Sequence, residues 1–237
     1  MSFYSDFAPY YEQVFPFREE VYGFLRGYAG VNGGTILDAG CGPGHYCGRF
    51  FQDGYQVTGI DLDGRMIEAA AAAYSGAMFR CMDIALIGSL QGSFDLVYSI
   101  GNVLSHLPQN RLPAFFHDIH ASLERGGYWI VQVVNWDFLV TLAEYSFPVK
   151  HIGSGETSFY RSYSFISSSN VIFEVKLVSG GTTVFRESSV LYPVSSEQYV
   201  QLHENAGFSL AGIYAGYDKA TFRKDRNSGL VMIFSKS

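Results

Sequence analysis

The residues with the clearest chemical potential lie in the stretch TILDAGCGPGHY, which runs over 35–46. Its glycines, Gly40, Gly42 and Gly44, follow an apolar run in the pattern G-x-G-x-G. This pattern is typical of a buried strand that enters a tight loop and then a helix, and such loops usually hold phosphate groups. Asp38 stands two residues before the first glycine. Its carboxylate would repel a pyrophosphate at that place.

Asp38 therefore favours a cationic ligand over one that carries phosphate groups. A ligand with an ammonium group and a sulfonium would be attracted to the carboxylate, and S-adenosylmethionine has both charges and no phosphate. Its adenosine would suit Asp61, which lies 21 residues after Gly40 at the end of the second expected strand and could bind ribose hydroxyls. The alternative is a structural role, in which Asp38 fixes the loop through backbone N–H groups.

Two later stretches agree with an adenosine ligand. In RCMDI, Asp83 ends the third expected strand and could accept a hydrogen bond from an adenine amino group, while Met82 or Ile84 packs on the ring. The alternative is a solvated loop aspartate. In FDLVYSIGNVLSHL, over 94–107, the fourth expected strand runs into a loop where a substrate would meet the methyl group.

The elements that must position these residues follow from the hydrophobic pattern. Apolar runs alternate with segments of helical period, which predicts a doubly wound, mostly parallel sheet of seven strands. The expected strands are 35–39, 55–61, 77–82, 94–100, 127–134, 208–214 and 229–235. The expected helices are 46–52, 64–74, 112–124 and 195–206, the last with Ser196 as its N-cap.

The pattern changes to period two between residues 157 and 192. The runs FYRSYSFI, NVIFEVKLV and TTVFRESSVLY are separated by SSSN and SGG, which are typical turn sequences. This predicts an antiparallel β insert over 150–193, after the fifth strand, that acts as a cap on a single domain spanning 1–237.

Composition limits the partners of the chain. The 237 residues contain 16 Lys and Arg against 22 Asp and Glu, for a net charge of −6, which disfavours nucleic acid and anionic lipid. The most apolar run, 128–134, is too short to span a bilayer, and no basic-then-apolar leader is visible. These features predict a soluble, cytoplasmic protein with a small neutral or cationic substrate. The oligomeric state is open, with a homodimer among the choices.

Cysteine, histidine and aromatic usage adds three further expectations. The three cysteines have no paired spacing, and the six histidines form no H-x-x-x-H cluster, so neither a disulfide framework nor a metal site is expected. The aromatic fraction is 16%, which fits either a core rich in rings or an aromatic-walled pocket.

The four stretches LDAGCGPG, TGIDLD, CMDI and FDLVYSIGNVLSHL, in this order, resemble the successive motifs of class I S-adenosylmethionine-dependent methyltransferases over about residues 35–135. The resemblance implies that the glycine loop lies along the methionine part, that Asp61 holds the ribose with Leu62 beside the adenine, and that backbone near Ser99 meets the methionine. The full expected cofactor set is Asp38, Gly40, Cys41, Gly42, Asp61, Leu62, Met82, Asp83, Ile84 and Ser99.

The loop IGNVLSHLP, over 100–108, resembles the corresponding loop of glycine N-methyltransferases, and Asn102 and His106 match its asparagine and histidine. One departure is informative. Where those enzymes have an arginine that grips the substrate carboxylate, this chain has Val134. A valine cannot bind a carboxylate, so glycine is a poor substrate candidate.

The resemblance also directs attention to residues that could align an acceptor. Methyl transfer is an in-line displacement, so the protein mainly orients the nucleophile and removes a proton. The candidates are Asn102, His106, Tyr11 and Arg161, with Tyr10 and Tyr163 beside them. Residues 1–30 resemble the helical lid of many relatives. Each candidate also has a structural alternative. The histidine could be structural, the asparagine could cap a turn, the arginine could lie on a solvated face, and Tyr10 and Tyr11 could only pack on the sheet.

Three functions remain open from the sequence. The favoured one is a methyltransferase that acts on an N or O atom of a small molecule. The second is an RNA or protein methyltransferase, for which the run RKDR at 223–226 is the supporting feature, although a solvated turn explains it as well. The third is a noncatalytic S-adenosylmethionine-binding module. A nicotinamide oxidoreductase is disfavoured because Asp38 would face its pyrophosphate.

Overall fold

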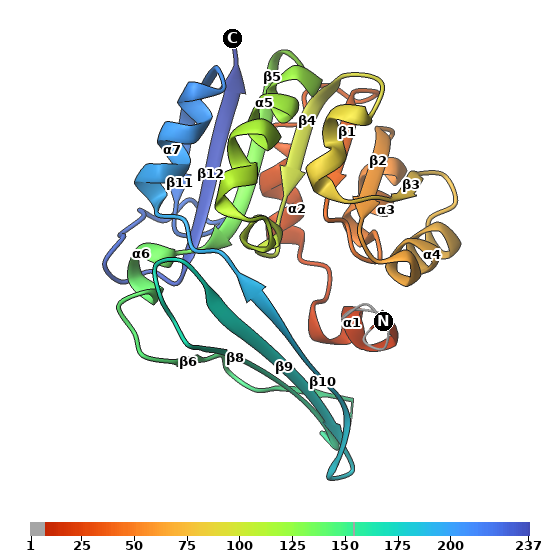
Figure 1. Ribbon diagram of the computed structural model, residues 1–237. Helices are drawn as coiled ribbons and strands as arrows, with labels where there is room; N and C mark the ends of the chain where they lie inside the picture. Colours follow the sequence, from red (N-terminus) through yellow and green to blue (C-terminus); the bar gives the residue numbers. More distant parts are fainter. Residues whose placement is uncertain (1–7, 154) are drawn as a thin grey trace.

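The computed structural model describes residues 8–153 and 155–237 of the chain (Figure 1). Its main sheet consists of β1 (Thr35–Ala39), β2 (Gln56–Asp61), β3 (Met78–Cys81), β4 (Phe94–Ser99), β5 (Leu123–Val134), β11 (Phe208–Tyr214) and β12 (Gly229–Lys236). The strand order is β11-β12-β5-β4-β1-β2-β3. Strands β1 to β5 pair in parallel, and β12 is antiparallel to both of its neighbours. The predicted doubly wound, seven-stranded sheet is confirmed.

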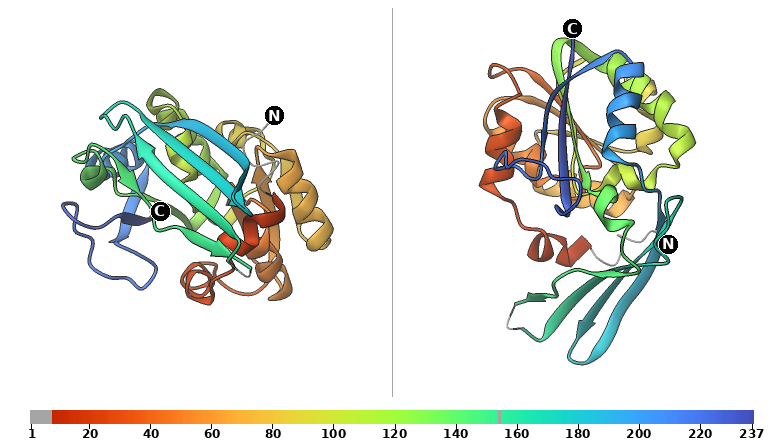
Figure 2. Two further views of the ribbon diagram at one scale, coloured as in Figure 1. Left: turned by 90° about the horizontal axis from the view of Figure 1, so that it is seen from below. Right: turned by 90° about the vertical axis from the view of Figure 1, so that its left-hand side faces the viewer.

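Helices cover both faces of this sheet (Figure 2). The helices on the faces are α2 (Glu19–Arg26), α3 (His45–Gln52), α4 (Gly64–Ala73), α5 (Leu112–Ser122) and α7 (Ser196–Asn205). Helices α1 (Ala8–Val14) and α6 (Trp136–Leu139) lie beyond the carboxyl ends of the parallel strands (Figure 1). Short 3-10 turns are η1 (Ile84–Ser89), η2 (Val103–His106) and η3 (Gln109–Arg111). In β1, Ile36 packs with α2 and α3, whereas Leu37 packs with α5 and α7. Alternate side chains of a strand point to opposite faces, so both faces are buried.

The observed boundaries correct two expectations. Helix α5 ends at Ser122 rather than Glu124, because the chain already pairs with β4 at Leu123, ahead of a register shift in the ladder. The N-cap of α7 is Ser195, not Ser196. Ser195 accepts the N–H of Gln198, whose side chain accepts the N–H of Ser195, and this reciprocal capping box satisfies two donors of the helix start.

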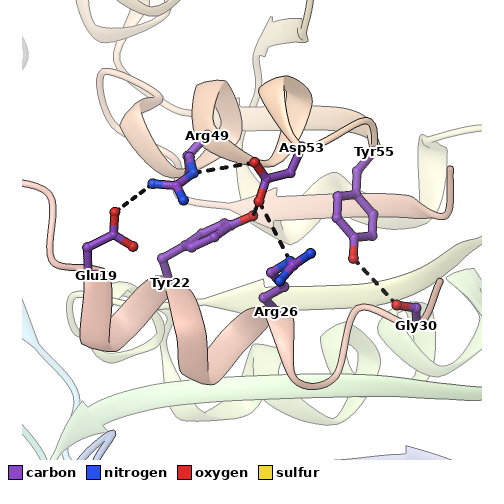
Figure 3. A network of polar contacts seen from close by, with 7 residues as sticks. All are labelled: Glu19, Tyr22, Arg26, Gly30, Arg49, Asp53 and Tyr55. Atoms are coloured by element: carbon purple, nitrogen blue, oxygen red, sulfur yellow. Dashed lines mark hydrogen bonds and ion pairs between the residues drawn. The ribbon is translucent and has the colours of Figure 1, made fainter. Parts of the chain in front are cut away.

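Helix α2 is fixed to the core by apolar packing and by a polar network (Figure 3). Arg49 on α3 lies 2.6 Å from the Glu19 carboxylate and 3.5 Å from Asp53, and Arg26 lies 3.6 Å from Asp53. The Tyr22 hydroxyl donates a hydrogen bond to Asp53. Burial raises the pKa of Tyr22, and the bond to the Asp53 carboxylate raises it further. Of the segment 1–30, α2 is thus part of the packed core, and residues 1–7 lie outside the described residues.

A second, smaller sheet forms the cap, which lies beyond the carboxyl ends of the parallel strands (Figure 1). It contains β6 (Tyr145–Ser146), β7 (Lys150–Ile152), β8 (Thr157–Ser164), β9 (Val171–Ser179) and β10 (Thr182–Leu191), all antiparallel. The period-two runs predicted the three long strands, whereas the two short ones carry no such pattern. Apolar side chains from α1, α4 and the cap form one cluster that includes Val14, Met66 and Phe159. Helix α1 therefore packs against both the cap and the main domain.

Candidate active site

Two adjoining cavities lie at the carboxyl ends of β1, β2 and β4, the place where doubly wound sheets bind ligands. The loop cavity, of about 500 Å³, lies between the glycine loop and the ends of β2 and β3; the cap cavity, of about 380 Å³, lies between the same loop and the cap. Both volumes suit a ligand of drug size. The residues that line both cavities are Tyr11, Gly40, Ile100, Gly101 and His106.

The glycine loop is held close to the sheet by its backbone. The N–H groups of Gly40 and Cys41 both donate to the Ile60 carbonyl, at 2.8 and 2.9 Å. Gly40 has φ of +97°, and a Cβ there would lie 2.6 Å from Val103 Cγ2. The N–H of Gly42 donates to Asp61 Oδ2 at 2.9 Å. A larger residue at Gly40 would displace the loop from the surface that both cavities share.

Asp38 is buried beneath this loop and lines the cap cavity. Its Oδ2 accepts hydrogen bonds from the Tyr98 hydroxyl at 2.9 Å and from Cys47 Sγ at 3.4 Å. Its Oδ1 is buried and has no partner among the described residues. Burial raises the pKa of Asp38 to about 7, against the lowering effect of Tyr98 and Cys47. A buried carboxylate oxygen that lacks a donor suits a ligand ammonium group.

Asp61 and Leu62 occupy the wall of the loop cavity, as expected for an adenosine site. Asp61 Oδ1 accepts the N–H of Asp63 at 2.9 Å, and its Oδ2 holds the loop at Gly42. Each carboxylate oxygen has two lone pairs, so the group can also accept a hydrogen bond from a ribose hydroxyl. Leu62 is 70% exposed, although it is a large apolar residue. Its position offers an apolar surface to an adenine ring.

The residues at the end of β3 divide into two groups. Asp83 and Ile84 line the loop cavity, and Asp83 Oδ1 accepts the N–H of Ala85 at the start of η1. Met82 does not line either cavity and packs against the core instead. Of the two residues expected to contact the adenine ring, Ile84 lines the loop cavity and Met82 does not.

Ser99 is fully buried, and its hydroxyl donates to the Ala39 carbonyl at 2.6 Å. It lines neither cavity, whereas the next residues, Ile100 and Gly101, line both. The serine thus ties β4 to β1. The expectation that backbone near Ser99 meets the methionine part stays a prediction.

Asn102 has a structural position at the end of β4. It has φ of +69°, its Oδ1 accepts the Ser105 hydroxyl at 2.7 Å, and the same atom accepts the N–H of Val134 at 3.0 Å. These bonds tie the loop after β4 to the end of β5, which favours the turn-capping reading. Asn102 nevertheless lines the cap cavity.

His106 lies at the junction of the two cavities. The residue is exposed, and desolvation by the surrounding protein lowers the pKa of the imidazole below its usual 6.5. A neutral imidazole can accept a proton at physiological pH. The expected role of His106 as a general base stays a prediction.

Tyr11 and Arg161 reach the same space from opposite sides. The Tyr11 ring would contact a Cβ at Gly42 at 3.5 Å, so it lies over the glycine loop. Arg161 points from β8 into the cap cavity, where its Cζ lies 4.4 Å from the Phe147 ring centroid and 5.2 Å from that of Phe15. It is half-buried rather than part of a solvated face. Tyr163 also lines this cavity, whereas Tyr10 does not.

Several further residues line the cap cavity that the sequence did not single out. They are Arg18, His45, Tyr46, Gln132, Lys150 and Tyr217. They come from five different segments. His45 and Tyr46 end the glycine-loop stretch 35–46, whereas the other four have no motif around them, so only the folded chain brings the set together. The alternation in β8 was the one signal that could have placed Phe159, Arg161 and Tyr163 on a shared face.

In the part of the chain that the structure describes, no group of three or more His, Cys, Asp or Glu side chains could hold a metal ion. No helix within the described ranges is both long and apolar enough to cross a membrane. The site residues do fit S-adenosylmethionine: an unpaired carboxylate oxygen lies at one end, and acids with an exposed leucine lie at the other.

Comparison with known proteins supports the same class. Residues 36–127 match the family model described as "Methyltransferase domain". The chain is 30% identical over 131 residues to a ubiquinone biosynthesis O-methyltransferase from Chromobacterium violaceum, a match that covers 53% of each protein. The chain thus spans about half the length of that relative.

Two solved structures share the fold. An S-adenosylmethionine-dependent methyltransferase from Clostridium acetobutylicum aligns over 100% of both chains with a TM-score of 0.80 at 16% identity. CalS10 from Micromonospora echinaspora, an amino pentose methyltransferase solved with S-adenosylmethionine bound, aligns over 100% of this chain and 92% of its own with a TM-score of 0.70 at 16% identity.

The strand order, the two cavities and the family match agree. Residues 36–127 match the model of a methyltransferase domain, and the chain has the fold of the class I S-adenosylmethionine-dependent methyltransferases. The further likeness of 100–108 to glycine N-methyltransferases stays a prediction.

Proposed function

We propose that the protein transfers the methyl group of S-adenosylmethionine to an N or O atom of a small molecule. The observation that carries this proposal is the junction of the two cavities at Gly40 and His106, with the unpartnered Oδ1 of Asp38 on the cap side. An elongated ligand that spans both cavities would have its middle, where the sulfonium lies, beside His106.

In this proposal the loop cavity binds the adenosine. Asp61 accepts the ribose hydroxyls, Leu62 and Ile84 pack on the adenine, and Asp83 accepts its amino group. Asp38 accepts the ammonium of the methionine part. S-adenosylmethionine supplies a methyl group on a positively charged sulfur, which is a good leaving group.

The remaining residues act on the acceptor. The cap and α1 exclude water from the junction, which strengthens electrostatic interactions there. His106 Nδ1 or Nε2 accepts the proton that the nucleophile loses as its bond to the methyl carbon forms and the bond from that carbon to sulfur breaks. Tyr11 covers the loop next to this point.

The recessed cap cavity supports a small acceptor over a macromolecule. Its volume of about 380 Å³ holds the methionine part together with a metabolite of modest size. The run RKDR, over 223–226, is exposed and forms a turn in which Arg226 pairs with Asp225 at 3.0 Å and Lys224 pairs with Glu197 at 2.7 Å. Two of the three cations of this run are already paired, which disfavours the turn as a docking surface for RNA.

The test uses methyl-labelled S-adenosylmethionine and a cell extract separated into small-molecule and macromolecular fractions. We expect enzyme-dependent label in the small-molecule fraction. Label confined to RNA or protein would contradict the small-molecule proposal. Binding of S-adenosylhomocysteine with no label in any fraction would favour a noncatalytic binding module.

A further inference from the structure

The charge of the cap cavity differs from that of the whole chain. The protein has a net charge of −6. Among the described residues that line this cavity, Asp38 is the one carboxylate, whereas Arg18, Lys150 and Arg161 bring three cations. Clefts lined by one sign of charge attract ligands of the opposite sign. A cavity of this charge in an acidic protein indicates an anionic ligand group.

The surroundings of the Arg161 side chain are typical of a residue that binds an anion. Its Nε is buried and has no hydrogen-bond partner, and the side chain forms no ion pair with a carboxylate among the described residues. The groups around it are the rings of Phe15 and Phe147, and burial lowers the pKa of the guanidinium. A buried guanidinium with a free N–H is costly unless a partner arrives, and its planar fork matches a carboxylate or phosphate.

Lys150 adds a second cation to the same wall. Strand β7 pairs with β8 so that Lys150 lies opposite Phe159, two residues from Arg161. Its Nζ donates to the Val14 carbonyl and lies 4.6 Å from the Phe15 ring centroid. Burial lowers the pKa of Lys150, and the charges of Arg161 and Arg18 lower it further. Two neighbouring cations therefore repel each other in this wall, and an anion between them would relieve the repulsion.

The carboxylate of the methionine part does not account for all three cations. It is bonded to the same carbon as the ammonium that Asp38 would hold, so it lies on the Asp38 side of the cavity. Arg18 already forms an ion pair with the Glu20 carboxylate, so it is not an unpaired cation of this cavity. Arg161 and Lys150 belong to the cap, on the wall where an acceptor would enter.

We infer that the methyl acceptor carries an anionic group, a carboxylate or a phosphate, that binds Arg161 and Lys150 of the cap. This inference rests on the proposed function. The aromatic side chains on the same face of the cap, Phe147, Phe159, Tyr163 and Phe173, would pack on the apolar part of the acceptor. The acceptor would then be an acidic metabolite with an apolar body, held at its charged end by the cap.

Matched probes that differ in charge test the inference. The protein is first saturated with S-adenosylhomocysteine, and calorimetry then measures the binding of benzoate, phenyl phosphate and the neutral benzamide. We expect one of the two anions to bind at least tenfold more tightly than benzamide. The anion that binds more tightly shows whether the acceptor carries a carboxylate or a phosphate. Arg161→Met should reduce this preference to less than twofold, and Lys150→Met should reduce it in part.

The controls separate this inference from the proposed function. Arg186→Met removes an exposed cap cation that pairs with Glu174 and lines neither cavity, so it should keep the preference. Equal binding of all three probes, or of none, overturns the inference while S-adenosylhomocysteine binding leaves the proposed function standing. An anion that displaces S-adenosylhomocysteine also overturns it, because the cap cations would then serve the methionine carboxylate. Failure to bind S-adenosylhomocysteine at all would contradict the proposed function itself.

Discussion

The two cavities of this protein share a wall but differ in how they are built. The loop cavity is made from short segments at strand ends, in which backbone N–H groups and carboxylates hold one another, as Gly42 and Asp61 do. The cap cavity is closed by side chains from a separate sheet, and aromatic rings and cations dominate there. Cofactor binding in the loop cavity should therefore depend on backbone geometry. Acceptor binding in the cap cavity should depend on which side chains one face of the cap sheet presents.

The two sides should also differ in how they respond to mutation. The strands below the loop cavity are buried on both faces, and Ile36 and Leu37 of β1 are each fully buried. The cap is one sheet with exposed apolar residues on its outer side, such as Val184 and Val190. Changes in the loop cavity should therefore affect cofactor binding sharply, and changes in the cap should affect the acceptor alone.

The largest effect is expected for Gly40→Ala. The new Cβ would meet Val103 at 2.6 Å and would also strain a backbone with φ of +97°. We expect calorimetry to show S-adenosylhomocysteine binding weakened by about 100-fold. Gly92→Ala is the matched control, because its φ is +106° and no atom lies within 4 Å of its Cβ. Wild-type affinity for S-adenosylhomocysteine in the Gly40 variant would contradict the proposal that backbone geometry governs cofactor binding.

His106→Ala should lower kcat by about 100-fold, the loss typical of a missing general base, with S-adenosylhomocysteine affinity unchanged within about twofold. His106 must be neutral to accept a proton, and its pKa is lowered below 6.5. Wild-type activity should therefore be full at neutral pH and fall as the pH drops through this lowered pKa. Loss of cofactor binding alone would make His106 structural. His117→Ala, on the exposed face of α5, should leave kcat unchanged.

Asp38→Asn should remove a pH dependence of cofactor binding. The carboxylate ionises near pH 7, so its attraction for the ammonium should strengthen S-adenosylhomocysteine binding by about tenfold between pH 6 and pH 8. In the Asn variant the affinity should be weaker at pH 8 and lack this rise, whereas the exposed Asp225→Asn should keep it. A wild-type affinity that does not change over this range would contradict the assignment.

The same group affects stability with a definite sign. The pKa of Asp38 is raised in the folded state, from 3.8 to about 7. Its contribution to the free energy of unfolding of the unliganded protein is therefore fully present below the unfolded pKa and lost as the pH rises through about 7. Asp38→Asn should flatten this part of the stability profile in urea unfolding experiments.

The smallest effect is expected for Leu62→Ala. Removal of this 70% exposed side chain should weaken S-adenosylhomocysteine binding by about threefold to fivefold, because less apolar surface meets the adenine. The free energy of unfolding should stay the same. Val31→Ala is the control, since Val31 is 84% exposed and lines neither cavity. A loss of stability without a change in affinity would show that Leu62 packs on the protein rather than on the ligand.

Two histidines show what the sequence alone could not predict. His203 is fully buried between Phe116 and Phe234, accepts a hydrogen bond from Trp129 Nε1 at 2.8 Å, and has its pKa lowered to about 3 by burial. His106 faces the junction of the cavities. Each is a lone histidine next to a leucine in sequence, so local sequence could not tell the core histidine from the candidate base.

The sequence by itself determined the class of the main domain. The spacing of Gly40, Gly42, Asp61 and Asp83 predicted the order of strand ends around the ligand, because loop geometry and carboxylate positions depend on short, local segments. The period-two runs predicted the three long cap strands. Helix boundaries were wrong by up to two residues, at α5, where pairing with β4 across the sheet overrides local helix preference.

Only the tertiary structure decided the acceptor side. Arg161 and Lys150 lie eleven residues apart in sequence, yet they share a wall because β7 pairs with β8. Arg18, Asn102 and Tyr217 reach the same cavity from distant segments. The burial of Asp38 Oδ1 without a donor, and of Arg161 Nε without an acceptor, follows from long-range packing that no local pattern encodes.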